Sequence, residues 1–433
     1  MIKQKNLHSV LKKKLTPINT FCAISIFSML VLLACFFISK GDLISQYFFY
    51  DMRDTGMDFF HSIEYVRGRT PYGVFNTLYP PLANLFFYFI YWLVPREVSV
   101  NWTYDFYQSI NFRGSYMDLR TYQAPLLLFV LFVLLVALFF IKMVRKYLAD
   151  YSGRMAELAA FCLLFSYGMM HGLERGNILI LTVPLIMFFV YYYNSENAAL
   201  SELAVLSLAI AAGLKIYPAF FGALLIRDKK YSQAARAVIY GVLSVILPVL
   251  FFREGLGGLK IWLNVTFDFG SANPSPHTGT GFASFLHRLA FYANQFFGLK
   301  LATGRFAAAG FLVALALLAA VLFLKKKWQC ILVITVAIIM FQSQGQYIYS
   351  LLCIPLCAFL SEEKTFTKQN GAPFALMVLM LVHLPIFTIA TRQPRLALLQ
   401  VISVLTALWC VVTSIRNIIN DKRGEAEHVN LAK

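Results

Sequence analysis

The chain has 433 residues, of which 59% are hydrophobic, and its mean hydropathy is +0.66. An average soluble domain contains only roughly 45–50% apolar residues, so this composition excludes a soluble globular protein. The net charge of +17 does not indicate nucleic-acid binding, because the basic residues gather in short loops between apolar runs. We therefore expect an integral membrane protein with the lipid bilayer, and no nucleic acid, among its partners.

Apolar runs recur along the whole chain and predict its fold class. Several approach the roughly 20 residues that one bilayer crossing requires, and shorter or polar-interrupted runs between them bring the expected total to about 11–13 membrane segments. We predict an all-α polytopic membrane protein that forms a single integral membrane domain over residues 1–433. The longest runs are Phe21–Ser39, Pro125–Ile141, Ala235–Phe252, Phe306–Leu324, Pro373–Ala390 and Leu396–Ile415.

The basic clusters predict the orientation. Loops rich in lysine and arginine face the cytoplasm, which predicts a multi-pass plasma-membrane protein with a cytoplasmic amino terminus and outer loops at residues 41–77 and 253–305. The first apolar run is too long for a signal peptide and no cleavage pattern follows it, so we interpret it as an uncleaved helix. The clusters are Lys12–Lys14, Lys142–Lys146, Arg227–Lys230, Lys325–Lys327 and Arg416–Arg423.

One part of this topology is inconsistent. If Leu78–Val94 returns the chain to the cytoplasm, then Pro125–Ile141 carries Lys142–Lys146 to the exterior, against the charge rule. Three solutions stay open. The Leu78 run enters the membrane and returns to the outer face, the loop at Arg96–Gln123 contains another crossing, or Lys142–Arg154 faces outward.

The first outer loop contains a segment with helical patterning. Phe59, Ile63 and Val66 recur at helical spacing, which favours an amphipathic helix along the membrane surface. Gly68 and Pro71 would end this helix. The alternative is a solvated loop at the interface.

The same loop carries the candidate catalytic acids. Asp54 and Asp58 are four residues apart and so share one helix face, where a carboxylate can act as a general base toward an acceptor hydroxyl. Arg67 and Arg69 are candidates for holding a leaving phosphate, and Lys215 would add positive charge there. This combination suits transfer from a lipid phosphate.

Lys215 interrupts the apolar run Ala198–Ile226, which is too long for one ordinary crossing. A lysine at the bilayer centre is costly. We therefore predict a short hairpin that turns at Lys215 and Pro218 and brings the ammonium group near the outer face.

The order of several motifs resembles glycosyltransferase family 87. Its amino-terminal signature is matched by Asp58-Phe-Phe, then Gly68 and Tyr72, then Tyr79-Pro-Pro at the start of a helix. Two later stretches agree in order. GLERGNILILTVPL at Gly172–Leu185 is similar to a Gly-Gln-x-Asn segment of the family, and AAGLKIYPAFFGALLIRDKK at residues 211–230 is similar to its Lys-x-x-Pro helix and basic loop.

The resemblance implies a GT-C membrane fold with outer amphipathic helices and an inverting transferase activity. Such an enzyme would move a hexose, with mannose the expected sugar, from a polyprenyl-phosphate donor to a hydroxyl of a glycan or glycolipid on the outer face. The base of the family is an acidic residue in the first outer loop, which Asp58 matches best and Asp54 second. No metal or cofactor is expected, because cationic side chains can stabilise a leaving phosphate.

Other polar residues complete the candidate substrate-binding set. Glu174 and Arg175 stand where many family members have Gly and Gln, and they would either form a local ion pair or contact the donor. Asn177 would bind a sugar hydroxyl or cap the following helix. Tyr79, from the Tyr-Pro-Pro motif, is counted with them.

The second outer loop, residues 253–305, is rich in Gly, Ser, Asn and Pro around GSANPSPHTGTG. This composition favours a mobile connection that could act as a lid, and His287 and Arg288 within it are candidate substrate-binding residues. The polar interruption at Phe341–Ser350 would form a helix junction or line the sugar pocket.

Two other functions are compatible with outer charges in a polytopic protein. A transporter or lipid flippase would use them along a substrate path, although we find no internal repeat of the kind that transporters commonly have. A glycan polymerase or ligase would use them to bind a complete lipid-linked glycan.

Overall fold

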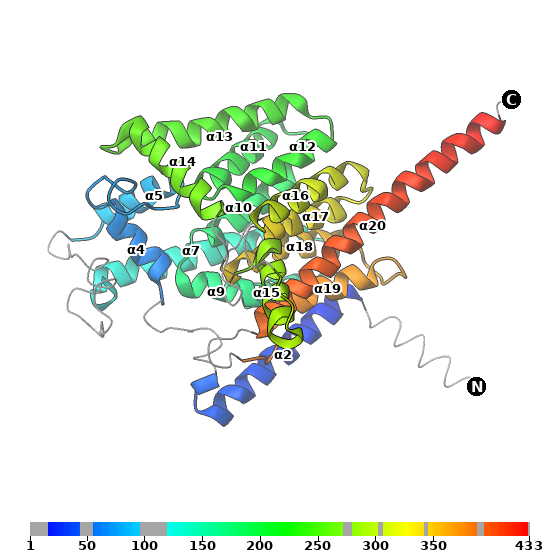
Figure 1. Ribbon diagram of the computed structural model, residues 1–433, viewed down its shortest axis with the longest axis horizontal. Coiled ribbons are helices and arrows are strands. Elements are labelled where there is room, and N and C mark those ends of the chain that lie inside the picture. Colours follow the sequence, from blue (N-terminus) through cyan, green and yellow to red (C-terminus); the bar gives the residue numbers. More distant parts are fainter. Residues whose placement is uncertain are drawn as a thin grey trace.

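The computed structural model describes residues 16–43, 55–95, 119–271, 279–301, 306–341, 345–387 and 394–431, and these ranges contain helices and no strand (Figure 1). Four helices in these ranges are long and apolar enough to cross a bilayer, which confirms the all-α polytopic membrane class. They are α2 (Pro17–Ser39), α7 (Gln123–Tyr147), α13 (Tyr231–Phe251) and α20 (Pro394–Leu431).

Shorter apolar helices fill the rest of the bundle. Helices α8 (Gly153–Leu164) and α9 (Tyr167–Arg175) meet at a bend of 61° and make a fifth candidate span if taken together. A helix rises about 1.5 Å per residue, so most of the others do not cross a core of about 30 Å alone. They are α10 (Leu179–Tyr192), α11 (Ala198–Leu214), α16 (Ala307–Ala320), α17 (Lys327–Phe341), α18 (Cys353–Glu362) and α19 (Gly371–Leu381).

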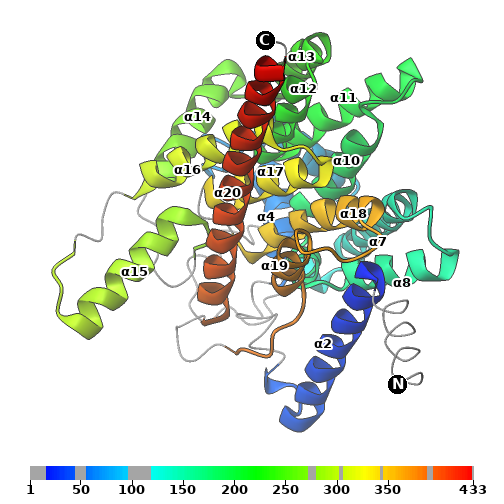
Figure 2. The ribbon, with the colours of Figure 1, turned by 90° about the vertical axis from the view of Figure 1, so that its right-hand side faces the viewer.

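The main core surrounds α17, in which every residue from Cys330 to Met340 is buried. A helix that is apolar on all sides is stable only inside a bundle, and α17 packs against α16, α18 and α20. In Figure 2, α20 passes across α17, and α15 (Gly281–Phe297) lies at the periphery beside α20. Short 3₁₀ segments join these helices: η3 (Leu119–Thr121), η4 (Tyr217–Gly222), η5 (Val321–Phe323) and η6 (Gln346–Leu352).

A second core supports the predicted amphipathic helix, which is α4 (Met57–Val66). Phe59, Ile63 and Val66 are buried, and the helix ends before Gly68, so the helical prediction is confirmed. The Phe59 ring packs edge-on against the rings of Phe87 and Phe129, with centroids 5.8 and 5.4 Å away. Aromatic contacts of this kind couple α4 to α5 (Pro81–Trp92) and α7.

The helices run between two ends of the molecule, which we call the α4 end and the α12 end. Figure 1 shows α4 and α5 at one side and α12 (Ala223–Arg227) toward the other. Arg120 Nη1 donates to Thr55 O at 2.9 Å, which places the start of α7 at the α4 end. Tyr147 Oη donates to Met187 O at 3.1 Å, and Tyr193 Oη to Asp228 Oδ2 at 2.7 Å, which links the end of α7 through α10 to the α12 end.

This arrangement decides part of the topology. Lys142–Lys146, at the end of α7, lies at the same end as Arg227–Lys230, so the structure does not favour turning that cluster away from the other basic loops. Helix α5 is about 18 Å long, too short to cross. Helix α5 begins near Tyr79 at the α4 end, and the next described segment, η3, also lies at the α4 end. This arrangement fits a segment that enters the membrane and returns to the same side. Residues 96–118 lie outside the described ranges.

The chain reverses direction at Lys215, as the hairpin prediction requires. Helix α11 begins beside Tyr193, whose carbonyl accepts a hydrogen bond from Ser201 Oγ at 3.1 Å, and it ends at Leu214. Lys215 has extended backbone angles, and η4 and α12 then lead back to Arg227, which donates to Leu324 O at 3.0 Å.

The prediction of a mobile connection over residues 253–305 is wrong for most of its length. Helix α14 (Gly255–Ser271) and α15 occupy it, and residues 272–278 and 302–305 lie outside the described ranges. Both helices carry apolar side chains at helical spacing. The Gly, Ser and Pro residues between them dominated the composition and hid this pattern.

Candidate active site

Asp58 stands in the first turn of α4 and pairs with Arg175, the last residue of α9. Arg175 Nε donates to Asp58 Oδ2 and Arg175 Nη2 to Asp58 Oδ1, both at 2.9 Å. The Arg175 side chain is 27% exposed and the Asp58 side chain is 19% exposed, so solvent and small ligands can reach this partly buried pair. Two parallel charge-assisted bonds fix the plane of the carboxylate.

Asn177 is the third member of this contact. Its Nδ2 donates to Asp58 Oδ2 at 2.6 Å, and its Oδ1 accepts from the backbone N–H of Leu179 at 2.9 Å. The side chain therefore caps the start of α10, as one of its two predicted roles requires, and orients the acid as well. The amide is buried, so its geometry is set by packing.

Glycines bring the two helix ends together. Gly176 ends α9 with φ of +63°, a left-handed conformation that favours glycine. A Cβ at this position would lie 2.7 Å from Phe59 Cβ. Close by, the Gly56 N–H donates to Glu174 O at 2.9 Å. Glu174 thus contributes its backbone to the docking of α4 on α9.

Lys215 reaches the same place from the end of α11. Its Nζ lies 4.5 Å from the centroid of the Tyr79 ring and 5.9 Å from those of Tyr217 and Tyr347. Tyr79 Oη in turn accepts from Asn177 Nδ2 at 3.4 Å. The ammonium group is therefore held by ring faces beside the acid, a favourable setting for a desolvated cation.

Tyr79 is positioned by the loop before α5. Asn84 Nδ2 and Tyr72 Oη both donate to Tyr79 O at 3.2 Å. Trp262 Nε1, on α14, donates to Leu78 O at 3.2 Å. These bonds hold the Tyr-Pro-Pro segment against α14 and thereby fix the position of the Tyr79 ring beside Lys215.

The electrostatics keep Asp58 ionised. Burial alone would raise the pKa of this carboxyl, but the Arg175 charge and hydrogen bonds, the Asn177 hydrogen bond and the Lys215 charge hold its pKa below the ordinary value. Its place in the first turn of α4 adds a favourable interaction with the helix dipole. A carboxylate that is charged at neutral pH can accept a hydrogen bond from a hydroxyl group.

The structure engages the other two predicted arginines elsewhere. Arg67 pairs with Glu64 at 3.3 Å within α4. The Arg69 guanidinium lies 4.4 Å over the Phe251 ring and donates to Phe251 O, which docks the loop after α4 on the end of α13. Neither of these contacts involves Asp58, Arg175 or Lys215. The role of Arg67 or Arg69 in holding a leaving phosphate stays a prediction.

Arg288 also lies apart from this cluster. It is buried on α15 and donates to Gln400 Oε1, and Gln400 Nε2 donates to Gly279 O at 2.9 Å. These bonds join α15 to α20. His287 is the neighbouring residue on α15. The second candidate acid, Asp54, lies outside the described residues.

Sequence reasoning missed a polar group that lies one turn before Arg175 along α9. The Arg395 guanidinium carbon lies 3.7 Å from the Tyr167 ring centroid, and Arg395 Nη2 lies 3.5 Å from His171 Nε2 and 3.4 Å from Gln346 Oε1. His171 is one turn before Arg175, so the two groups are neighbours. Arg395 is too distant in the chain for any local pattern to link it to α9.

Tyr217 was not assigned to the site, and Tyr347 was covered only by the alternative that Phe341–Ser350 lines the sugar pocket, although each had a sequence signal. Tyr217 follows Lys215 by two residues, at the predicted turn of the hairpin. Tyr347 belongs to the polar interruption of an apolar stretch at Phe341–Ser350, where buried tyrosines need a polar partner.

Comparison with known proteins adds an independent finding. No curated protein matches the chain. The family model for glycosyltransferase family 87 matches residues 77–355, a range that includes Tyr79, Arg175, Asn177 and Lys215 and begins after Asp58. Because this match covers more than half of the chain, the protein belongs to glycosyltransferase family 87.

Proposed function

We propose that the protein transfers a hexose, with mannose the expected sugar, from a polyprenyl phosphate to a hydroxyl of a glycan or glycolipid. Membership of a glycosyltransferase family favours transfer over transport of a lipid-linked substrate. The observation that carries the proposal is the convergence of Asp58, Arg175 and Lys215 at the α4 end. The concentration of basic loops at the α12 end supports an outward-facing α4 end at the plasma membrane.

In the proposed reaction, Asp58 acts as general base. The acceptor oxygen attacks the anomeric carbon and its proton passes to Asp58. The bond between the anomeric carbon and the phosphate oxygen breaks, and the phosphate keeps the electron pair. Attack from the face opposite the leaving group inverts the configuration. Asn177 holds the carboxylate in place throughout.

The cations serve the leaving group. In the described residues, Lys215 has ring faces as its contacts and no carboxylate within ion-pair distance, so its charge is available to a phosphate. Arg175 already holds the Asp58 carboxylate through two hydrogen bonds. When a phosphate enters, it competes with Asp58 for the guanidinium, which releases carboxylate lone pairs for the acceptor hydroxyl.

The direct test is Asp58→Asn in purified protein reconstituted in lipid, supplied with labelled polyprenyl-phosphate hexoses and membrane glycolipids. The amide keeps the shape and loses the base, so kcat should fall by about 10²–10⁴, while donor binding persists. Asp228→Asn, at the α12 end, is the matched control and should keep its turnover. Full turnover by Asp58→Asn would remove Asp58 from the mechanism.

A further inference from the structure

The junction between α13 and α14 holds the loop that follows α4. This junction consists of residues 251–254, and Figure 1 shows it near α5. The Arg253 N–H donates to Arg69 O at 2.9 Å, and the Arg69 guanidinium lies over the Phe251 ring. Arg69 has φ of +59°, a left-handed conformation that residues other than Gly, Asn and Asp rarely adopt. Contacts with the junction therefore stabilise a loop conformation that is unfavourable by itself.

Glu254 makes a further contact between the junction and this loop. Its Oε1 accepts a hydrogen bond from the Gly73 N–H, and its Oε2 accepts a longer one from the Tyr72 N–H at 3.4 Å. Hydrogen bonds from backbone N–H groups to an ionised carboxylate are stronger than those between neutral groups. Because the two N–H groups belong to successive residues, the carboxylate fixes both the position and the orientation of this stretch of the loop.

Two glycines make room for the Glu254 side chain. A Cβ at Gly73 would lie 2.9 Å from Glu254 Oε1. A Cβ at Gly258, on α14, would lie 3.0 Å from Glu254 Cβ and 3.1 Å from Tyr72 Cδ2. Glycine allows such close approach because it has no side chain. A larger residue at Gly73 would displace the carboxylate.

Tyr72 connects this contact to the candidate active site. Its side chain is fully buried, and its Oη accepts from Asn84 Nδ2 at 2.9 Å and donates to Tyr79 O at 3.2 Å. The Tyr79 ring centroid lies 4.5 Å from Lys215 Nζ. Tyr72 is thus bonded to Glu254 through its backbone and to Tyr79 through its side chain.

We propose that Glu254 is a positioning residue of the active site, which holds the Tyr79 ring against Lys215 through Tyr72. This inference rests on the proposed transferase function. Glu254 acts at a distance from the reacting atoms, and it sets where the Lys215 ammonium stands relative to the leaving phosphate. A misplacement of about 1 Å at a reacting centre can cost about a hundredfold in rate, so a contact behind the ring can affect kcat.

The first test measures the contact itself and needs no catalysis. Glu254→Ala removes both acceptor oxygens, so amide hydrogen exchange in peptides that cover Gly73–Asn84 should accelerate by about tenfold or more. Glu202→Ala is the matched control, because the Glu202 carboxylate accepts from Arg236 Nε at 3.0 Å and Tyr240 Oη, which joins α11 to α13 and not to this loop. It should leave exchange in these peptides unchanged. Unchanged exchange in folded Glu254→Ala would overturn the proposal.

The second test measures the effect on the reaction. Glu254→Gln keeps the volume of the side chain and loses one acceptor oxygen, so kcat should fall by about tenfold while the KM for the acceptor stays unchanged. Gly73→Ala should have a similar effect, because its Cβ displaces Glu254 Oε1. Glu202→Gln should keep its turnover. Thermal melting reports whether each variant folds.

Combination with Lys215→Met distinguishes positioning from a general loss of stability. Because Glu254 acts through Lys215, Glu254→Gln should lower kcat no further in the Lys215→Met protein. A second loss of about tenfold there, or an equal fall of kcat in Glu202→Gln, would overturn the proposal. Absence of transfer by the wild type would instead overturn the proposed function, and hydrogen exchange would still decide whether Glu254 holds the Tyr79 segment.

Discussion

Lys215 at the α4 end and Lys327 at the α12 end have similar aromatic surroundings and different polar ones. Lys215 Nζ lies 4.5 Å from the Tyr79 ring centroid, and Lys327 Nζ lies 4.6 Å from that of Tyr193. Within the described ranges, only Lys327 also donates to a backbone carbonyl, that of Val190 at 2.6 Å. A cation that caps a helix serves the fold, whereas one placed between rings and an acid can serve a ligand.

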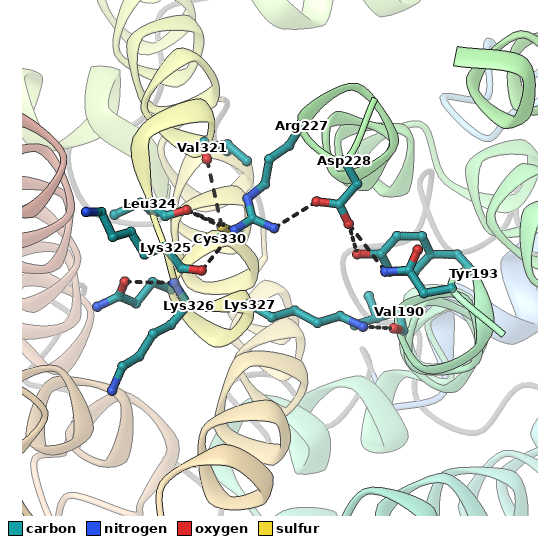
Figure 3. A network of polar contacts seen from close by, with 12 residues as sticks. Val190, Tyr193, Arg227, Asp228, Val321, Leu324, Lys325, Lys326, Lys327 and Cys330 are labelled. Atoms are coloured by element: carbon teal, nitrogen blue, oxygen red, sulfur yellow. Dashed lines mark hydrogen bonds and ion pairs between the residues drawn. The ribbon is translucent and has the colours of Figure 1, made fainter. Parts of the chain in front are cut away.

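The surroundings of Lys327 show the same pattern (Figure 3). Arg227 pairs with Asp228 at 2.8 Å and donates to the carbonyls of Leu324 and Lys325, each at 3.0 Å. These bonds satisfy carbonyls that helix ends leave open. The α12-end network therefore fastens α10, α12 and α17 together, and its basic residues are largely used by the protein itself.

The largest difference between the two ends should appear on removal of the lysines. Lys215→Met should lower kcat by about 10²–10³, because one charge that stabilises the leaving phosphate is lost. Lys327→Met should leave kcat unchanged and lower the free energy of unfolding by about 1.5–3 kcal/mol, the usual contribution of a hydrogen bond from a charged group. Turnover assays and thermal melts of both variants check this. Equal losses of kcat in the two variants would show that Lys215 and Lys327 do not differ in their role in the reaction.

Substitution of Arg175 and Arg227 should give a smaller difference in activity between the two ends. Arg175→Lys keeps the charge beside Asp58 but loses the fork that makes two parallel bonds. The loss of one charged bond, about 1.5–3 kcal/mol, corresponds to a decrease of about tenfold to a hundredfold in kcat/KM. Arg227→Lys is the matched control and should affect stability alone. Wild-type kcat/KM in Arg175→Lys would show that the fork is unimportant for the reaction.

Glu64, also on α4, should affect the stability of the fold through its ionisation. Burial raises its pKa to about 7, although the Arg67 charge opposes the shift. Because its folded pKa lies above the ordinary value of 4.5, the folded state holds a proton that the unfolded state releases. Stability should therefore fall between about pH 4.5 and pH 7, by at most about 3 kcal/mol.

Glu64→Gln removes this titration, so its melting temperature should depend less on pH than that of the wild type. Asp58 shifts in the opposite direction, and its contribution is lost only as the pH falls toward its lowered pKa. Melting curves over this pH range distinguish the two carboxyls. An identical pH dependence in Glu64→Gln and wild type would show that Glu64 is not buried as described.

Features that depend on neighbouring residues were predictable from the sequence. The apolar composition led to the helical membrane class, the spacing of Phe59, Ile63 and Val66 led to α4, and the charge of Lys215 inside an apolar run led to the hairpin. Each follows from local periodicity or from the cost of a charge in lipid. The same local reasoning failed over residues 253–305, where a glycine-rich junction obscured two helices.

Only the tertiary structure decided which side chains meet. Arg175 contacts Asp58 across 117 positions of the chain, whereas Arg69, which is much nearer in sequence, packs on Phe251. The close approach of α11 and α13 at Gly213, where a Cβ would lie 2.5 Å from Ser244 Oγ, is likewise decided by tertiary packing. Such contacts depend on the shapes of packed helices, which a residue pattern along one segment does not contain.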